Sequence, residues 1–314
     1  MEKKEPPYPP FKYRGKLYTP KRKLRIRGKL FFIVEEWSTR YKAFDTSSKQ
    51  WRSIRVRNAN VKHEMHLMQF AKMRNSSVPY SFEHFKDEQN EYLVQEWVDG
   101  YDLRYYLRRE SPGTSFIDAE RSYHLIRGLV YGLNKLHERG VIHGDIKPEN
   151  LIVADTKRLT MIDFGAAWTG ARTKLRPDQK TRGYASPEQW QREKLVDHRT
   201  DQFSTSVVFY EMLTGDLPYD GLGGFGSDYA NHPSLIPPSK KNREVWGSLN
   251  GVIMRGLSLD RNQRYETSAA WLQALNEAMP AKATRHDPFS AYLPGIDLWQ
   301  NFKTFIANIR SRLK

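Results

Sequence analysis

The sequence has 314 residues, 39% of them hydrophobic, and a formal net charge of +15 at pH 7. This length and composition allow a sizeable core, built as one large domain or as two lobes. The sequence has no cysteine, which excludes a disulfide framework and suits a reducing compartment, so we expect a cytoplasmic location. No apolar run approaches the ~18 residues of a membrane span, and residues 1–10 lack the apolar region of a signal peptide, so a soluble protein is expected.

The positive charge lies at the two ends of the chain. Residues 1–30 hold 11 Lys or Arg against 2 Glu, residues 281–314 hold 6 against 2 acidic residues, and residues 31–280 keep only +2 of the net charge. Such tails are either solvated arms or segments attracted to an anionic membrane surface, a nucleic acid or an acidic partner. Specific recognition of nucleic acid is not expected.

The two tails differ in pattern. Residues 1–27 are Pro-rich and then Lys/Arg-rich, which disfavours helix and predicts an extended basic arm. Residues 281–314 form a basic C-terminal tail, in which apolar residues fall on one face of a helix. That helix either packs on the rest of the protein or binds a membrane surface or a partner. Its apolar residues are Leu298, Trp299, Phe302, Phe305, Ile306, Ile309 and Leu313.

Between the tails, the pattern changes from strands to helices. The strand-like runs predict an antiparallel sheet with one helix, and the helical stretches predict a mainly helical second part. The β-prone runs cover residues 30–34, 40–44, 51–56, 81–85 and 91–98, and the helical patterns cover residues 61–73, 119–138 and 203–213.

Polar residues of different kinds lie at fixed spacing after the helical stretch over 119–138. Asp145, Lys147 and Asn150 share one loop, and Asp163 follows the next strand. Metal-assisted phosphoryl transfer needs such a set, because one carboxylate orients a hydroxyl nucleophile and an ammonium neutralises the moving phosphoryl group. An amide and a second carboxylate then hold Mg²⁺. Each residue alone would be an ordinary loop polar group, but the four together predict this chemistry.

The runs His143–Asn150 and Asp163–Gly165 resemble the catalytic loop and the metal-binding loop of eukaryotic-like serine/threonine protein kinases. The resemblance covers most of the chain and implies an α+β, bilobal fold. Its N-lobe, residues 28–98, would hold a five-stranded antiparallel sheet with one helix. Its C-lobe, residues 99–280, would be mainly helical.

The resemblance also implies a role for each polar residue. Asp145 would be the catalytic base, Lys147 the phosphate clamp, and Asn150 and Asp163 the ligands of Mg²⁺. Thr181, at the end of the activation segment, would contact Asp145 and Lys147, as in serine/threonine kinases. The expected reaction is transfer of the γ-phosphate of ATP to Ser or Thr of a protein substrate.

Further positions bear on regulation and on the fold. Gly144 stands where the family usually has an Arg that pairs with a phosphorylated activation loop, so its presence predicts an enzyme that does not depend on that phosphorylation. Glu188 would pair with Arg264. Asp201 resembles the buried Asp that holds the catalytic loop from below.

The nucleotide-binding positions implied by the resemblance are less typical. Arg55 stands where the third strand usually carries a Lys that pairs with the ATP phosphates, and Glu64 would be its ion-pair partner. The hinge from Glu96 to Val98 would recognise adenine through its backbone, and Ile152 would contact the nucleotide.

The phosphate cover departs from the family pattern. Residues 35–39 contain no glycine where the family has a glycine-rich loop. Ser53 replaces the usual Ala, and Arg40 falls where an apolar residue usually covers the adenine. A guanidinium at Arg55 is longer and bulkier than an ammonium. The phosphate cover is therefore either remodelled or lost.

Three functions fit this pattern. The complete C-lobe set favours an active serine/threonine protein kinase that uses ATP and Mg²⁺. The N-lobe departures favour a pseudokinase, which would keep the fold as a binding module. A small-molecule kinase of the aminoglycoside or choline type also has a sequence like His143-Gly144-Asp145, but Lys147 and Thr181 argue against it.

Overall fold

The computed structural model describes residues 11–13, 16–26, 29–37, 40–57, 61–72, 77–86, 90–110, 117–154, 158–171, 180–191, 195–225 and 233–280. The predictions made for residues 1–10, for the middle of the activation segment and for the amphipathic C-terminal helix lie outside these ranges. Among the described residues, no helix combines the length and the apolar character that crossing a lipid bilayer requires.

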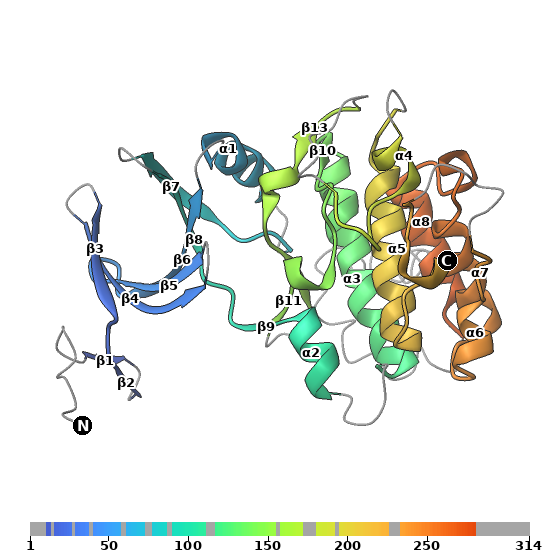
Figure 1. Ribbon diagram of the computed structural model, residues 1–314, viewed down its shortest axis with the longest axis horizontal. Coiled ribbons are helices and arrows are strands. Elements are labelled where there is room, and N and C mark those ends of the chain that lie inside the picture. The colour runs from blue at the N-terminus through green and yellow to red at the C-terminus, as the bar shows by residue number, and fades with distance from the viewer. Residues whose placement is uncertain are drawn as a thin grey trace, which may run out of the picture.

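A small lobe built on a curled sheet and a larger lobe of helices are joined by the extended segment that follows β8 (Figure 1). The small-lobe sheet is antiparallel and six-stranded, in the order β3-β4-β5-β6-β8-β7. Helix α1 packs against β7 and β8. The α+β, bilobal prediction is confirmed. The elements of this lobe are β3 (Arg22–Ile26), β4 (Lys29–Trp37), β5 (Arg40–Asp45), β6 (Gln50–Arg57), α1 (Val61–Lys72), β7 (Ser81–Lys86) and β8 (Glu91–Glu96).

The small-lobe sheet has six strands, whereas the sequence predicted five. The five expected strands are present, and β3 adds a sixth by pairing with β4 from Arg22↔Ile33 to Ile26↔Lys29. Lys23 and Arg25 on β3 are exposed, and Leu24 packs against the buried cluster of the sheet. The strand contains mostly charged residues, so its sequence did not indicate a strand. Its side chains nevertheless alternate between the inner and the outer face of the sheet. Residues 22–26, which the sequence assigned to the arm, are therefore part of the sheet.

Two short strands precede this sheet. β1 (Phe11–Tyr13) and β2 (Lys16–Tyr18) pair with each other as an antiparallel ladder. The Tyr18 ring packs edge-on against Trp51 of β6, with ring centroids 4.8 Å apart. The described residues of these two strands are thus extended.

The core of the small lobe lies on one face of its sheet. Side chains from five strands, β4 to β8, meet there, and each of the larger apolar ones contributes roughly 1.5–3 kcal/mol by leaving water. Phe85 of β7 and Tyr92 of β8 stack with ring centroids 4.5 Å apart. The buried cluster comprises Phe31, Ile33, Ala43, Ile54, Phe85, Tyr92 and Val94.

Two long helices form the centre of the large lobe. α3 (Ala119–His137) and α5 (Arg199–Thr214) contact each other and lie side by side (Figure 1). Asp118 caps α3, because its side chain accepts a hydrogen bond of 2.9 Å from the backbone N–H of Arg121. α5 is buried along its length and ends at Gly215, whose φ of 75° is the left-handed conformation that glycine adopts most readily.

Short strands and helices complete the large lobe and carry the loops of the site. The strands are β9 (Gly100–Asp102), β10 (Val141–Ile142), β11 (Leu151–Ala154), β12 (Leu159–Met161) and β13 (Trp168–Thr169). The helices are α2 (Leu103–Glu110), α4 (Pro187–Trp190), α6 (Pro238–Lys241), α7 (Gly247–Gly256) and α8 (Ser268–Ala278), with 3₁₀-helices η1 (Pro148–Asn150), η2 (Phe164–Ala166), η4 (Tyr219–Gly221) and η6 (Arg261–Gln263). Leu67 and Met68 of α1 share one core cluster with Phe164 of η2, so packing joins the two lobes next to Asp163.

Candidate active site

The catalytic loop between β10 and η1 is held by a buried carboxylate from α5. Asp201 accepts hydrogen bonds from the backbone N–H of His143 at 2.9 Å and of Gly144 at 2.8 Å. The ring Nε2 of His137 lies 2.8 Å from the same carboxylate. Burial alone would raise the pKa of Asp201, but the His137 contact and the backbone N–H of Gly144 outweigh it and hold this pKa below its usual value. Asp201 thus fixes the loop, as the sequence predicted.

Three side chains converge on the carboxylate of Asp145. The ammonium of Lys147 lies 2.7 Å from Asp145 Oδ2, and the amide of Asn150 donates to the same oxygen at 2.9 Å. The hydroxyl of Thr181 donates to Asp145 Oδ1 at 2.6 Å and accepts from Lys147 Nζ at 2.9 Å. The predicted contact of Thr181 with Asp145 and Lys147 is therefore present. Asp145 therefore accepts a hydrogen bond from a hydroxyl that also contacts an ammonium.

Asp163 begins the turn that follows β12. Its φ of 68° and ψ of 74° are left-handed, and its Oδ1 accepts a hydrogen bond from the backbone N–H of Gly165 at 3.2 Å. Phe164 packs edge-on against the His143 ring, with centroids 4.8 Å apart. This packing ties the turn to the catalytic loop.

The donor set suits a magnesium ion. The Nδ2 of Asn150 is committed to Asp145, while among the described residues no hydrogen bond reaches Asn150 Oδ1. Amide and carboxylate oxygens are the ligands that Mg²⁺ takes from protein, with phosphate oxygens completing its shell. Asn150 and Asp163 therefore fit the ion chemically, and bound Mg²⁺ would neutralise charge on the nucleotide phosphates.

Arg55 links the small lobe to the Asp163 turn. Its Nη1 lies 2.8 Å from Glu64 Oε1 on α1 and 2.7 Å from Asp163 Oδ1. Arg55 and Glu64 are both almost completely buried. Burial alone would lower the pKa of Arg55, and the charges of Glu64 and Asp163 raise it above its usual value instead. The predicted Arg55–Glu64 ion pair is present, and Arg55 also engages a predicted metal ligand.

The hinge residues lie between the lobes. The backbone N–H of Glu96 donates to Tyr80 O at 2.7 Å at the end of β8. Val98 follows in the extended segment, and among the described residues no backbone hydrogen bond engages its N–H or C=O. Ile152, partly buried on β11, pairs with Asp102 of β9 in the sheet that leads from the hinge into the large lobe. A backbone edge with free hydrogen-bonding groups can recognise a heterocyclic base.

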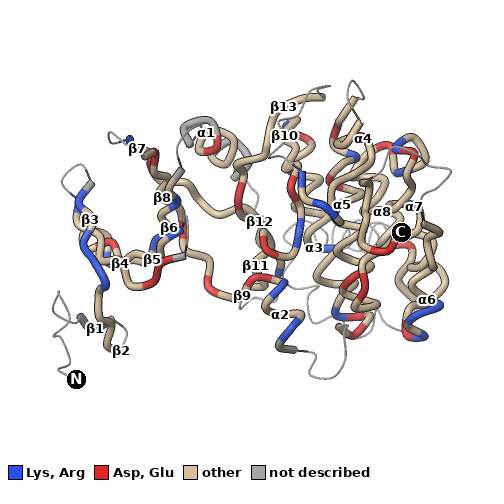
Figure 2. The backbone as a smooth tube through the Cα atoms, viewed as in Figure 1, with Lys and Arg blue, Asp and Glu red and all other residues tan. Residues whose placement is uncertain are grey.

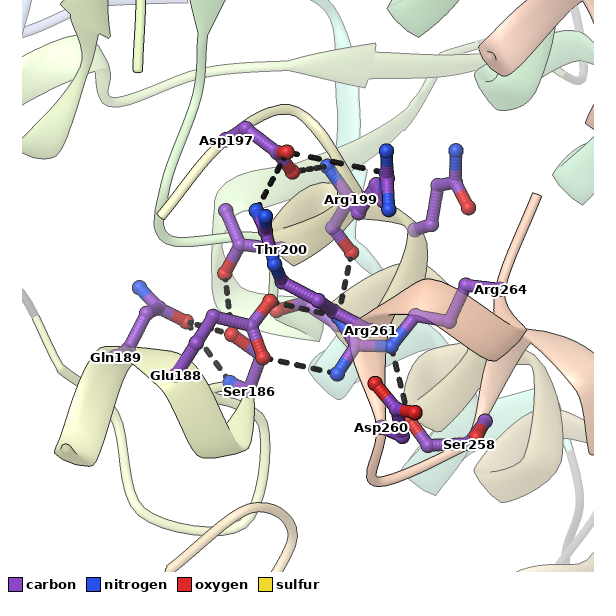
Figure 3. Close-up of polar contacts among 12 residues, drawn as sticks. Ser186, Glu188, Gln189, Asp197, Arg199, Thr200, Ser258, Asp260, Arg261 and Arg264 are labelled. Atoms are coloured by element: carbon purple, nitrogen blue, oxygen red, sulfur yellow. Dashed lines mark hydrogen bonds and ion pairs between the residues drawn. The ribbon is translucent and has the colours of Figure 1, made fainter. Parts of the chain in front are cut away.

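A buried ion pair anchors α4, at the end of the activation segment. Arg264 donates from Nη1 and Nη2 to the two carboxylate oxygens of Glu188, at 2.7 and 2.9 Å (Figure 3). Its Nη1 also reaches the backbone carbonyl of Arg199 at 3.0 Å, and its Nε donates to that of Ser258 at 2.8 Å. The predicted pairing of Glu188 with Arg264 is confirmed.

Comparison with known families gives the same reading over most of the chain. A family model described as the protein kinase domain matches residues 28–273. The chain belongs to the protein kinase family.

Several relatives of this kinase carry serine/threonine kinase names. It is 33% identical over 184 residues to the serine/threonine-protein kinase PknB of Mycolicibacterium smegmatis, a match that covers 57% of this chain and 29% of the relative. It is 34% identical over 184 residues to PknB of Mycobacterium tuberculosis, with the same coverage. A probable serine/threonine-protein kinase of Clostridium acetobutylicum is 27% identical over 248 residues, which cover 75% of this chain and 37% of that protein. The matches thus span about a third of these relatives' length.

Two features set this kinase apart from the usual pattern. β4 runs to Trp37 and pairs it with Arg40, the first residue of β5, so only two residues connect the strands. No room remains for a long loop over the phosphates. The second feature is Trp168, which sequence analysis missed. A Cβ at Gly144, whose φ is 76°, would overlap the indole of Trp168, which is completely buried. A tryptophan after the Asp163 turn was a visible signal, but its contact with residue 144 depends on the tertiary fold.

Proposed function

We propose that this protein transfers the γ-phosphate of ATP to Ser or Thr hydroxyls of a protein substrate, using Mg²⁺. The arrangement of Thr181, Asp145 and Lys147 supports this most directly, because a hydroxyl, a carboxylate and an ammonium already meet within hydrogen-bonding distance. A substrate hydroxyl that took the place of the Thr181 contact would find the same two groups.

Each residue acts on a stated group. Asp145 would orient the attacking hydroxyl and accept its proton, and Lys147 would balance charge on the phosphoryl group in transfer. Asn150 and Asp163 would hold Mg²⁺. Arg55, positioned by Glu64, would contact the phosphates. The hinge from Glu96 to Val98 and Ile152 would bind the adenine end of ATP.

The test is incorporation of radiolabelled phosphate by purified protein into itself and into casein or histones. Substitution Asp145→Asn should lower the rate by about 10²- to 10⁴-fold, as loss of a general base does. Asp216→Asn is the matched control, because Asp216 is exposed and paired only at the surface. Equal incorporation by the wild type and by Asp145→Asn would contradict kinase activity.

Activity without phosphorylation of the activation segment is part of the proposal. A phosphate on that segment would meet no Arg at residue 144, where Trp168 fills the space instead. Gln189 of α4 donates to the backbone carbonyl of Gly144 at 3.0 Å. Packing and this hydrogen bond would hold the segment in place of a phosphate–arginine pair.

A pseudokinase that serves as a scaffold or binding module, with a degenerate nucleotide site, is the second candidate. One observation favours it: Arg55 pairs with Asp163, so a proposed metal ligand is engaged by a protein cation. Titration with Mg²⁺-ATP in a thermal-unfolding assay measures nucleotide binding, and the phosphate-transfer assay separates the two candidates. A kinase should be stabilised by the nucleotide and transfer phosphate, whereas a scaffold should fail the transfer assay.

We further infer a cytoplasmic location, and for the basic tails either an anionic membrane surface or an acidic partner. Lys21, Lys23 and Arg25 at and along β3 are exposed, and basic residues line this edge of the sheet (Figure 2). Lowered binding to anionic vesicles as salt rises would support electrostatic attachment.

A further inference from the structure

The first residue of β5, after the shortened hairpin, lies on the face of the sheet from which Arg55 reaches the Asp163 turn. Arg40 of β5 lies directly opposite Arg55 of β6 in the antiparallel ladder. Residues paired in this way project from the same face of a sheet. Arg55 reaches Glu64 and Asp163 on that face, so the Arg40 side chain also extends from the side of the sheet that faces α1 and the Asp163 turn.

The surroundings of Arg40 come from both lobes. Its guanidinium is partly buried and interacts electrostatically with Arg55, Asp163, Glu64 and Asp102. Burial and then the nearby Arg55 lower the pKa of Arg40, and the three acids act in the opposite direction. The charges that act on Arg40 thus come from the small lobe, from the Asp163 turn and from β9, where Asp102 pairs with Ile152.

Neither arginine has its hydrogen-bonding capacity filled. Among the residues that the structure describes, no hydrogen bond or ion pair engages the Arg40 guanidinium. Arg55 uses Nη1 for both of its acidic partners, and its buried Nε has no partner in the same part of the chain. Buried polar groups in proteins are normally paired, so the buried Nε of Arg55 without a described partner, beside the partly buried guanidinium of Arg40, points to an anionic ligand.

We propose that Arg40, beside Arg55, binds the phosphate groups of the nucleotide and replaces the phosphate cover that the two-residue hairpin cannot form. A guanidinium presents two parallel N–H donors that match the oxygens of a phosphate. The strand backbone at this position offers no such pair of donors. This inference rests on the proposed function, since it concerns the same cleft. It adds a recognition residue for the triphosphate.

An arginine at position 40 could also have the opposite effect on nucleotide binding. An Arg40 side chain that merely occupied the adenine site would hinder nucleotide binding, and its removal would strengthen that binding. The two effects differ in sign and in their dependence on phosphate. A ligand series from adenosine to ATP therefore distinguishes them.

The experiment measures binding of Mg²⁺-ATP and of adenosine to the purified full chain by isothermal titration calorimetry. Arg40→Ala and Arg40→Lys are compared with Arg25→Ala, which removes an exposed arginine of β3. Loss of a charge-assisted contact should weaken ATP binding of Arg40→Ala by about 10- to 100-fold. Adenosine binding should change by less than about 3-fold, a difference worth well under one charged hydrogen bond. Arg40→Lys should fall between, and Arg25→Ala should match the wild type.

Any other result contradicts either the assignment of Arg40 alone or the proposed function as well. Unchanged or tighter ATP binding by Arg40→Ala, with phosphate transfer intact in the wild type, overturns the assignment of Arg40 and leaves the proposed function standing. Equal losses for adenosine and ATP overturn it too, since the phosphates would not be what Arg40 recognises. Failure of the wild type to bind Mg²⁺-ATP overturns both. Unfolding curves without ligand verify that each variant is folded, and Arg40→Lys keeps the test decisive if Arg40→Ala is not.

Discussion

The indole of Trp168 occupies the space into which a side chain at Gly144 would project. Trp168 is completely buried with Ile142 and Val196 in a small cluster of its own, and β13 pairs with β10 at Ile142↔Trp168. Gly144, the residue before the proposed catalytic base Asp145, is thus held in place by the packing of β13, the strand that follows the Asp163 turn.

Gly144→Ala should therefore destabilise the protein more than Gly140→Ala. Both glycines have positive φ, 76° and 68°, but a Cβ at Gly140 meets no atom within 4 Å. The backbone penalty of about 1–2 kcal/mol is common to both variants. Overlap with a buried ring should add about 1–3 kcal/mol for Gly144→Ala alone. Urea unfolding of the two variants measures the difference, and equal free energies of unfolding would contradict the packing described for Trp168.

Phosphatase treatment should leave the transfer rate of the purified protein unchanged. The residue that usually pairs with a phosphorylated activation segment is absent, and Trp168 and Gln189 engage the catalytic loop instead. The rate is measured before and after removal of phosphate, with mass spectrometry confirming the removal. A loss of more than about tenfold, the scale on which phosphate-dependent contacts act, would show that a phosphate matters.

The buried pair of Glu188 and Arg264 should be costly to break. Their side chains are 5% and 0% exposed, so Arg264→Met leaves a buried carboxylate without its partner, a loss of about 3–5 kcal/mol. Breaking the surface pair of Lys241 and Asp216 by Asp216→Asn should change stability by less than about 1 kcal/mol. Chemical unfolding of both variants provides the comparison. A loss of unfolding free energy for Arg264→Met as small as that for Asp216→Asn would contradict the stabilising role of the buried pair.

Acidification should weaken the protein partly through Asp201. Its pKa is lower in the folded protein than its ordinary value of 3.8, so its stabilising contribution is full above that value and is lost as pH falls through the folded pKa. In Asp201→Asn the amide NH₂ must face one of the two N–H groups of His143 and Gly144, a loss of about 1.5–3 kcal/mol at pH 7. The stability gap between wild type and variant should narrow below about pH 4. A gap independent of pH would exclude ionisation of Asp201 as its source.

The convergence of Asp145, Lys147 and Asn150 could be predicted from the sequence because the three residues are close along the chain. Asp145, Lys147 and Asn150 lie within six residues, so one loop brings them together once Asp201 fixes it. Glu188 and Arg264 were predicted through a family resemblance, not through spacing. The pairing of Arg40 with Arg55 and its nearness to charges of the large lobe, by contrast, depend on hairpin length, strand register and the approach of two lobes, which no short pattern encodes.

The β3 strand has a consequence for any shortened version of this protein. The family match begins at residue 28, yet Arg22–Ile26 cover one side of β4. A fragment that starts at the family boundary would present a row of unsatisfied amides and carbonyls along a nine-residue strand, the kind of surface on which chains stack into aggregates. The basic residues of β3, which made the strand hard to predict, also disfavour pairing with the edge of another sheet. The intact N-terminal region therefore protects the edge of β4 from aggregation.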